Sequence, residues 1–145
     1  LYQIQLFEAA LDKDGIAYKE YAIADTNEVQ SVTTAAAGEC DVLYIPTDNT
    51  LASVTETVYN VVAPAKIPVI AGEEGICNGC GVATLSISYY DLGYATGEMA
   101  YEILAEGADI TTMDVRYAPN VTKKYNAKIC EELGITVPDD YVAIQ

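Results

Sequence analysis

The sequence predicts an α/β fold in which helices flank a doubly wound, Rossmann-like parallel sheet. Short apolar runs rich in β-forming residues alternate along the chain with segments of helical periodicity, and the connections between them are short. Hydrophobic residues make up 51% of the chain and charged residues 20%, which is typical of a globular protein. The 145 residues are enough for one domain with a buried core.

The stretch from Asp41 to Leu51 shows the clearest transition from strand to helix. Residues 42–45 form the apolar run expected of a parallel strand covered on both faces, and Pro46 ends it because proline has no N–H for a ladder. The four polar residues 47–50 can cap a helix over roughly residues 51–62. In open α/β sheets ligands bind outside the carboxyl ends of strands, so these residues are either a ligand-binding tip or only a helix cap.

The other elements follow from the same signals. Apolar residues at helical spacing predict a first helix that ends at Asp14-Gly15. Asp25-Thr-Asn27 with Gln30 resembles a capping box that opens a helix toward Gly38. We expect strands at residues 18–23, 67–71, 82–86 and 110–117, and a glycine-rich loop over 72–81. We expect one helix from Asp91 to about Glu106. A last helix should be capped by Asn120 or Thr122 and end at Gly134.

Charge and composition exclude several classes of function. The net charge is −15, which argues against nucleic acid and anionic membrane surfaces as partners. There is no histidine, so neither a Ser-His-Asp nor a Cys-His arrangement can be built. Gly72-Glu-Glu-Gly75 lacks the lysine and the hydroxyl residue of a phosphate-binding loop. We therefore expect a binding protein rather than an enzyme, with no catalytic residue, no metal and no cofactor.

The four cysteines leave three interpretations open. Cys77 and Cys80 form a CxxC motif in the glycine-rich stretch, where they could make a tight local disulfide or remain free thiols. A zinc site would need Cys40 and Cys130 to converge on them, and a redox motif would normally follow a strand and start a helix. Cys40 and Cys130 themselves look like small buried residues at the ends of elements.

Five motifs occur in order along the chain: Asp41–Ile45, Pro-Thr-Asp-Asn at 46–49, Ile67-Pro-Val-Ile70, Tyr89-Tyr-Asp-Leu-Gly93 and Leu133-Gly-Ile-Thr-Val-Pro138. Together they resemble the family of ABC-transporter substrate-binding proteins with the type I periplasmic-binding fold, in the group associated with aromatic amino acids. The resemblance covers the second half of a typical member. It implies a two-lobed protein that closes on a small ligand. Residues 1–90 would form one ligand-binding lobe, 91–118 would cross to the other lobe, and 119–145 would be a return helix and tail.

The resemblance also implies site residues. Thr47, Asp48 and Asn49 would face the cleft from one strand end and Glu73 from the next, while Ser88 and Tyr89 would lie where the chain crosses between lobes. Asp48 or Glu73 could hold the ammonium of an amino acid, hydroxyls and helix N-terminal N–H groups suit its carboxylate, and Tyr89 could stack on an aromatic ring. Each has a simpler interpretation: Asp48 as a cap, Glu73 as a solvated loop acid, Tyr89 as core. Ser88 replaces the acidic residue usual in the family, which weakens the case for an ammonium contact there.

The beginning of the chain adds one expectation. A βα chain normally opens with a strand, whereas this sequence opens inside an amphipathic helix, so a first strand is expected to be missing. By resemblance it would lie between residues 18–23 and 41–45, and the apolar stripe of the long helix would pack on the other lobe. The stripe consists of Leu92, Ala95, Met99, Ile103 and Leu104. We expect the absent lobe or another copy of the chain to fill these surfaces.

The implied setting is an ABC importer. By resemblance the partners would be a small-molecule ligand and a membrane permease, and the location extracytoplasmic, in the periplasm or lipid-anchored at the cell surface. Two alternatives share the fold. One is the sensor domain of a transcription regulator, which would need a basic helix-turn-helix upstream, and the other is a flavodoxin-like redox protein that uses Cys77 and Cys80.

Overall fold

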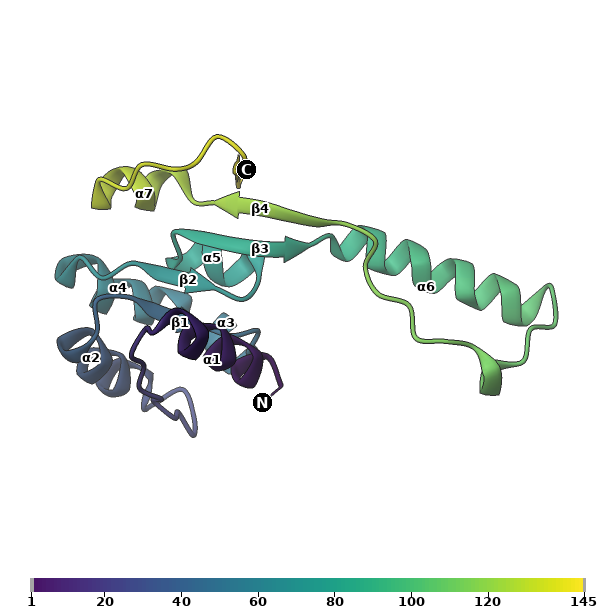
Figure 1. Ribbon diagram of the computed structural model, residues 1–145, viewed down its shortest axis with the longest axis horizontal. Helices are drawn as coiled ribbons and strands as arrows, with labels where there is room; N and C mark the ends of the chain where they lie inside the picture. Colours follow the sequence, from purple (N-terminus) through teal and green to yellow (C-terminus); the bar gives the residue numbers. More distant parts are fainter. Residues whose placement is uncertain (1, 145) are drawn as a thin grey trace.

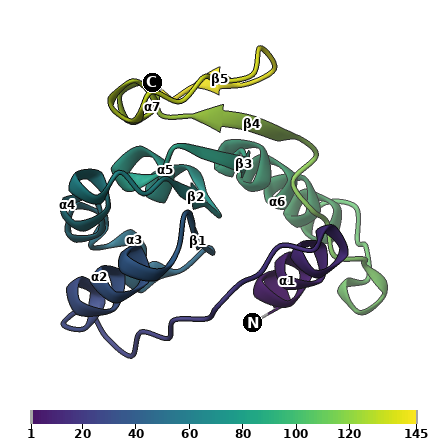
Figure 2. The same ribbon diagram turned by 60° about the vertical axis from the view of Figure 1, so that its left-hand side comes forward.

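The computed structural model describes residues 2–144, which contain a five-stranded, mostly parallel sheet (Figure 1 and Figure 2). The strands lie side by side in sequence order. The first three are parallel, β4 runs antiparallel to β3, and β5 is parallel to β4. Their bounds are β1 Leu43–Ile45, β2 Val69–Ala71, β3 Ala83–Ile87, β4 Val121–Tyr125 and β5 Val142–Ala143. The predicted α/β class is confirmed.

Seven α-helices and one 3₁₀ turn accompany the described strands. They are α1 Tyr2–Asp14, α2 Val29–Glu39, α3 Asn49–Ala52, α4 Thr55–Ala65, α5 Glu74–Cys80, α6 Tyr89–Leu104, η1 Ile110–Thr112 and α7 Ala127–Leu133. The first helix ends as predicted, with Gly15 in the left-handed region at φ +71°. Over residues 2–144, none of these helices combines the length and the apolar character that a membrane span requires.

Strand alternation divides the sheet into two faces. Tyr44, Ile70, Ala83 and Tyr125 are cross-strand partners and therefore point to one face, where Phe7 of α1 stacks on Tyr44 and α7 packs on the others. The neighbouring row points to the opposite face, which α2, α4 and α5 cover. The main core lies there, built from buried side chains of all three helices and the first two strands: Val29, Ile45, Val58, Val62, Val69, Ala71, Ile76, Cys77 and Cys80.

The helix α6 and the segment after it form an arm that projects beyond the sheet (Figure 1). None of the residues of α6 is buried. The return segment is tied to the helix by Arg116, which donates to Glu102 at 2.6 Å, and by Asn120, which donates to Asp91 at 3.4 Å. Of the predicted apolar stripe, four residues are half-buried, whereas Leu104 is 86% exposed.

Two predicted strands are wrong. Residues 18–23 form no strand, because among the described residues no strand lies beside them, and β1 pairs only with β2. Their side chains are held instead by Glu39, which accepts hydrogen bonds from Lys19 and Tyr21. Residues 110–117 form η1 and an irregular segment within the arm, likewise outside the sheet. Apolar content alone therefore misled the prediction where no ladder partner exists.

The predicted glycine-rich loop over 72–81 is also wrong, because most of it forms α5. Its two capping bonds and three buried side chains, Ile76, Cys77 and Cys80, outweigh the low helix propensity of its glycines. The predicted helix over 51–62 is split into α3 and α4. The first of them begins at the predicted cap, Asp48, whereas α4 begins after Val54 without a side-chain cap, so a break at Ser53 and Val54 separates the two helices.

Three predicted helix starts need correction as well. The last helix is capped by Asn126, not Asn120 or Thr122, because residues 121–125 pair with β3 as β4. The predicted capping box with Gln30 is replaced by a turn in which Asp25 accepts from the N–H of Asn27. The long helix begins at Tyr89 rather than Asp91, since Ser88 is its cap.

Candidate ligand-binding site

The carboxyl ends of β1, β2 and β3 meet at one edge of the sheet because these strands are parallel. A polar tip follows each of them: residues 46–49 after β1, 72–74 after β2 and Ser88 after β3. The N-terminus of α1 reaches the same edge, where Gln3 contacts the first tip. This edge is the place at which open α/β sheets bind ligands.

Two side chains of the first tip, Thr47 and Asp48, make hydrogen bonds that hold it in place. The Thr47 hydroxyl donates to the carbonyl oxygen of Gly72 at 3.1 Å and so joins the ends of β1 and β2. Asp48 caps α3, with its Oδ1 accepting from the N–H of Leu51 at 2.9 Å. Among residues 2–144 its Oδ2 has no hydrogen-bond partner, and Asn49 beside it is exposed. The cap interpretation of Asp48 is thus confirmed, and one carboxylate oxygen remains open to a ligand.

Glu73, on the second tip, is the N-cap of α5. Its Oε2 accepts from the N–H of Gly75 at 2.8 Å and its Oε1 accepts from the N–H of Ile76. Both oxygens therefore satisfy helix N–H groups that would otherwise lack partners. The prediction that Glu73 is a solvated loop acid is wrong, and its caps make Glu73 less available to a ligand ammonium than Asp48.

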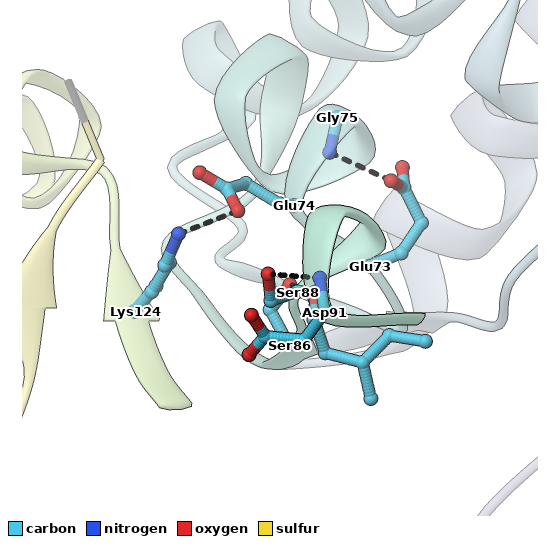
Figure 3. A network of polar contacts seen from close by, with 8 residues as sticks. Glu73, Glu74, Gly75, Ser86, Ser88, Asp91 and Lys124 are labelled. Atoms are coloured by element: carbon cyan, nitrogen blue, oxygen red, sulfur yellow. Dashed lines mark hydrogen bonds and ion pairs between the residues drawn. The ribbon is translucent and has the colours of Figure 1, made fainter. Parts of the chain in front are cut away.

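The third tip begins the crossing into the arm. Ser88 caps α6 by accepting from the N–H of Asp91 at 3.1 Å, which Figure 3 shows. Tyr89 follows as the first helical residue and is 58% exposed, so its interpretation as a core residue is wrong. Its ring is free to contact a ligand or another part of the protein.

A partly buried ion pair supports this crossing from the side. Lys124 of β4 donates to Glu74 of α5 at 2.6 Å, and buried Ser86 lies nearby in Figure 3. Lys124 points to the α5 face because it is the register partner of Thr84. The pair joins the second tip to the strand that returns from the arm. Sequence reasoning missed it, since residues 50 positions apart carry no local signal of contact.

Gln3 is the second residue that sequence reasoning missed. Its Oε1 accepts from the backbone N–H of Thr47 at 3.0 Å. One turn further along α1, Phe7 stacks on Tyr44 with ring centroids 3.9 Å apart. The i, i+4 spacing of Gln3 and Phe7 places both on the helix face that meets β1 and was the only available signal.

The cysteines are free thiols in the structure, so the disulfide interpretation is not supported. Cys77 and Cys80 are buried in the core between α5 and the sheet, and burial raises the pKa of each to about 12. Thiols that remain protonated at neutral pH are poor nucleophiles, which argues against the redox alternative. Of the other two, Cys130 is buried and Cys40 is half-buried.

We expect thiol-alkylating reagents to distinguish these cysteines in the native protein. At pH 8, Cys40 should react with iodoacetamide, whereas Cys77, Cys80 and Cys130 should react only after denaturation, because burial blocks access and keeps them protonated. Peptide mass spectrometry of the labelled protein measures this. Rapid native labelling of Cys77 or Cys80 would contradict the buried placement of α5.

The same burial predicts how stability depends on pH. Both pKa values rise from 9.0 in the unfolded chain to about 12 in the folded protein, so unfolding releases protons above pH 9. The stabilisation is complete below pH 9 and is lost as pH rises toward 12. Urea denaturation should therefore give a lower free energy of unfolding at pH 10 than at pH 8. The double variant Cys77→Ala, Cys80→Ala should show a smaller difference between the two pH values.

The sequence and the fold of this chain are similar to those of known binding proteins. Over 107 residues, 70% of this chain and 31% of the relative, the sequence is 38% identical to a tyrosine-binding protein of Clostridioides difficile (strain R20291). A ligand-free, open substrate-binding protein with adhesive properties from Clostridium difficile is 34% identical, with a TM-score of 0.75 over 99% of this chain and 50% of that one. The L-Trp complex of an ABC domain from Streptococcus pneumonia is 33% identical, with a TM-score of 0.86 over 95% and 46%.

The mostly parallel sheet with its flanking helices defines a domain of the periplasmic-binding class, whose fold the similar solved structures share. The chain belongs to the ABC transporter substrate binding protein family, whose sequence profile matches residues 1–144. It spans about half the length of the two solved relatives and 31% of the tyrosine-binding protein.

Proposed function

We propose that this chain is one lobe of an extracytoplasmic solute-binding protein that delivers an aromatic amino acid to an ABC importer. The observation that carries the proposal is the joining of the first two polar tips by the Thr47–Gly72 hydrogen bond at the carboxyl edge of the sheet. Relatives that share a third of the sequence bind tyrosine or were solved with L-Trp, which supports the ligand class.

The residues at the edge suit an amino acid. The open Oδ2 of Asp48 accepts a ligand ammonium, and the exposed amide of Asn49 and the Ser88 hydroxyl can donate to a carboxylate. The exposed ring of Tyr89 offers a stacking surface for an aromatic side chain. Thr47 contributes by its fixed position, because its hydroxyl proton is committed to Gly72. Glu73 holds the second tip in place and adds negative charge near the ammonium.

The exposed surface of the arm is evidence in favour of a second lobe. The outer side of α6 carries exposed aromatic and apolar residues, Tyr90, Tyr94, Tyr101 and Leu104, and the return segment adds Ile110, Val115 and Tyr117. Exposed apolar surface of this extent marks an interaction site. We assign it to packing against a second lobe, with residues 1–90 forming the first lobe, 91–118 crossing, and 119–145 returning. Within residues 2–144 the outer edge of β1 pairs with no strand, so it is a further position for another strand of the complete protein.

The proposed solute-binding function implies a membrane partner and a location outside the cytoplasm. Closing of two lobes around the ligand would present a surface to a membrane permease. Binding proteins of such importers act outside the cytoplasm, in the periplasm or attached to the cell surface by a lipid.

A thermal-shift panel on the complete encoded protein tests the function. L-tyrosine or L-tryptophan at about 100 times its Kd should stabilise the folded state by about 2.7 kcal/mol and raise the Tm by several degrees. Tyramine lacks the carboxylate and 3-(4-hydroxyphenyl)propionate lacks the ammonium, so both should give much smaller shifts. Equal shifts with all compounds, or none with any amino acid, would reject the amino-acid site.

A further inference from the structure

The side chain of Gln3 connects α1 to the first polar tip through its amide oxygen. Its Oε1 accepts from the N–H of Thr47 at 3.0 Å. The Gln3 side chain also acts on the Tyr44 hydroxyl: burial raises the pKa of that hydroxyl, and Gln3 partly opposes the rise. Tyr44 in turn lies under the ring of Phe7 at 3.9 Å. Gln3 thus joins α1 to the tip, and Phe7 joins the same helix to β1.

The space around Gln3 leaves the amide little freedom. Gly72 lies directly beside it, and a Cβ on Gly72 would be 2.9 Å from the Gln3 Nε2 and 2.6 Å from the Thr47 nitrogen. One side of the half-buried amide therefore lies against the ends of β1 and β2. An exposed surface glutamine would show none of these constraints, as the neighbouring, exposed Gln5 illustrates.

We infer that Gln3 is a positioning residue of the ligand site, which sets the backbone of residues 46–49 so that Asp48 and Asn49 face the ligand. This inference rests on the proposed function. The N–H of Thr47 is the last backbone donor before Asp48, so the direction of that N–H fixes the orientation of the tip. Gln3 holds this donor from α1, while the Thr47 hydroxyl holds the same residue from β2.

A positioning role differs from a purely structural one. A purely structural residue contributes only to the stability of the fold. Removing the hydrogen-bond acceptor of a positioning residue, with its packing retained, also changes the affinity for the ligand. Gln3→Met retains the length and apolar contacts of the side chain but lacks the acceptor. Gln3→Glu restores an oxygen that accepts from the Thr47 N–H. The matched control is Gln5→Met, two residues away on the exposed side of the same helix.

Isothermal titration of the complete protein with L-tyrosine and with L-tryptophan tests the inference. Loss of one neutral hydrogen bond predicts that Gln3→Met binds about threefold to tenfold more weakly than wild type. Gln3→Glu should recover affinity relative to Gln3→Met, and Gln5→Met should bind as wild type does. Hydrogen exchange at the Thr47 amide should be faster in Gln3→Met than in Gln5→Met.

Each outcome separates this inference from the proposed function. If wild type binds either amino acid and Gln3→Met binds equally well, the positioning role is rejected while the function stands. If wild type binds neither, the proposed function fails, and exchange at Thr47 still reports on the contact. Unchanged exchange in Gln3→Met would then reject the positioning of the tip as well.

Discussion

Replacing Asp48 by asparagine in the complete protein should lower its affinity for the proposed amino-acid ligand by about 30-fold, because loss of a partly buried charge partner costs about 2 kcal/mol. The asparagine oxygen still accepts from the N–H of Leu51, as the Asp48 Oδ1 does at 2.9 Å. The Tm should therefore remain close to that of wild type. Isothermal titration and thermal melting of the same samples measure the two effects.

Asp109 provides the matched control for this prediction. Its Oδ1 accepts from the N–H of Thr111 at 2.9 Å, so it is also an N-cap, but it lies in the arm. Asp109→Asn should leave affinity unchanged. Asp48→Ala adds the loss of the cap and should reduce the free energy of unfolding by about 1 kcal/mol. Wild-type affinity in Asp48→Asn would show that Asp48 is a helix cap only.

Adding one methyl group at Gly72 is expected to disrupt the site and destabilise the fold. An alanine Cβ would lie 2.6 Å from the Thr47 nitrogen and 2.8 Å from the Pro46 carbonyl carbon. Both are backbone atoms, so the ends of β1 and β2 must separate to admit the methyl group. We expect the free energy of unfolding to fall by about 1 to 3 kcal/mol and ligand binding to be lost. Urea denaturation and titration with L-tyrosine measure the two quantities.

Gly38 supplies the control for this substitution. It lies inside α2, and an added Cβ would meet nothing within 4 Å. Gly38→Ala should therefore raise stability by about 0.5 to 1 kcal/mol, because alanine loses less conformational freedom in a helix. If Gly72→Ala were as stable as Gly38→Ala and still bound ligand, the close joining of the two strand ends would be incorrect.

The residues at the strand ends show how far sequence reasoning reached at the site. The apolar run before Pro46 and the polar residues after it predict a strand that ends in a capped helix, and both are observed. The same pattern cannot say whether Asp48 only caps or also binds. The structure shows one bonded oxygen and one without a partner among residues 2–144. The predicted ligand contacts of all six site residues stay predictions.

Local sequence determined the elements that carry their own signals, such as the first helix, β1 and the end of α7 at Gly134. Caps, left-handed glycines and buried apolar runs act within a few residues, which is why they can be read directly. Only the tertiary structure decided the fate of residues 18–23 and 72–81. A strand forms only where an adjacent strand offers ladder hydrogen bonds. A glycine-rich helix forms only where packing of its apolar side chains against a core offsets its low helix propensity. The hydrogen bond from the Thr47 N–H to Gln3 likewise joins residues 44 positions apart, and no local sequence pattern predicts it.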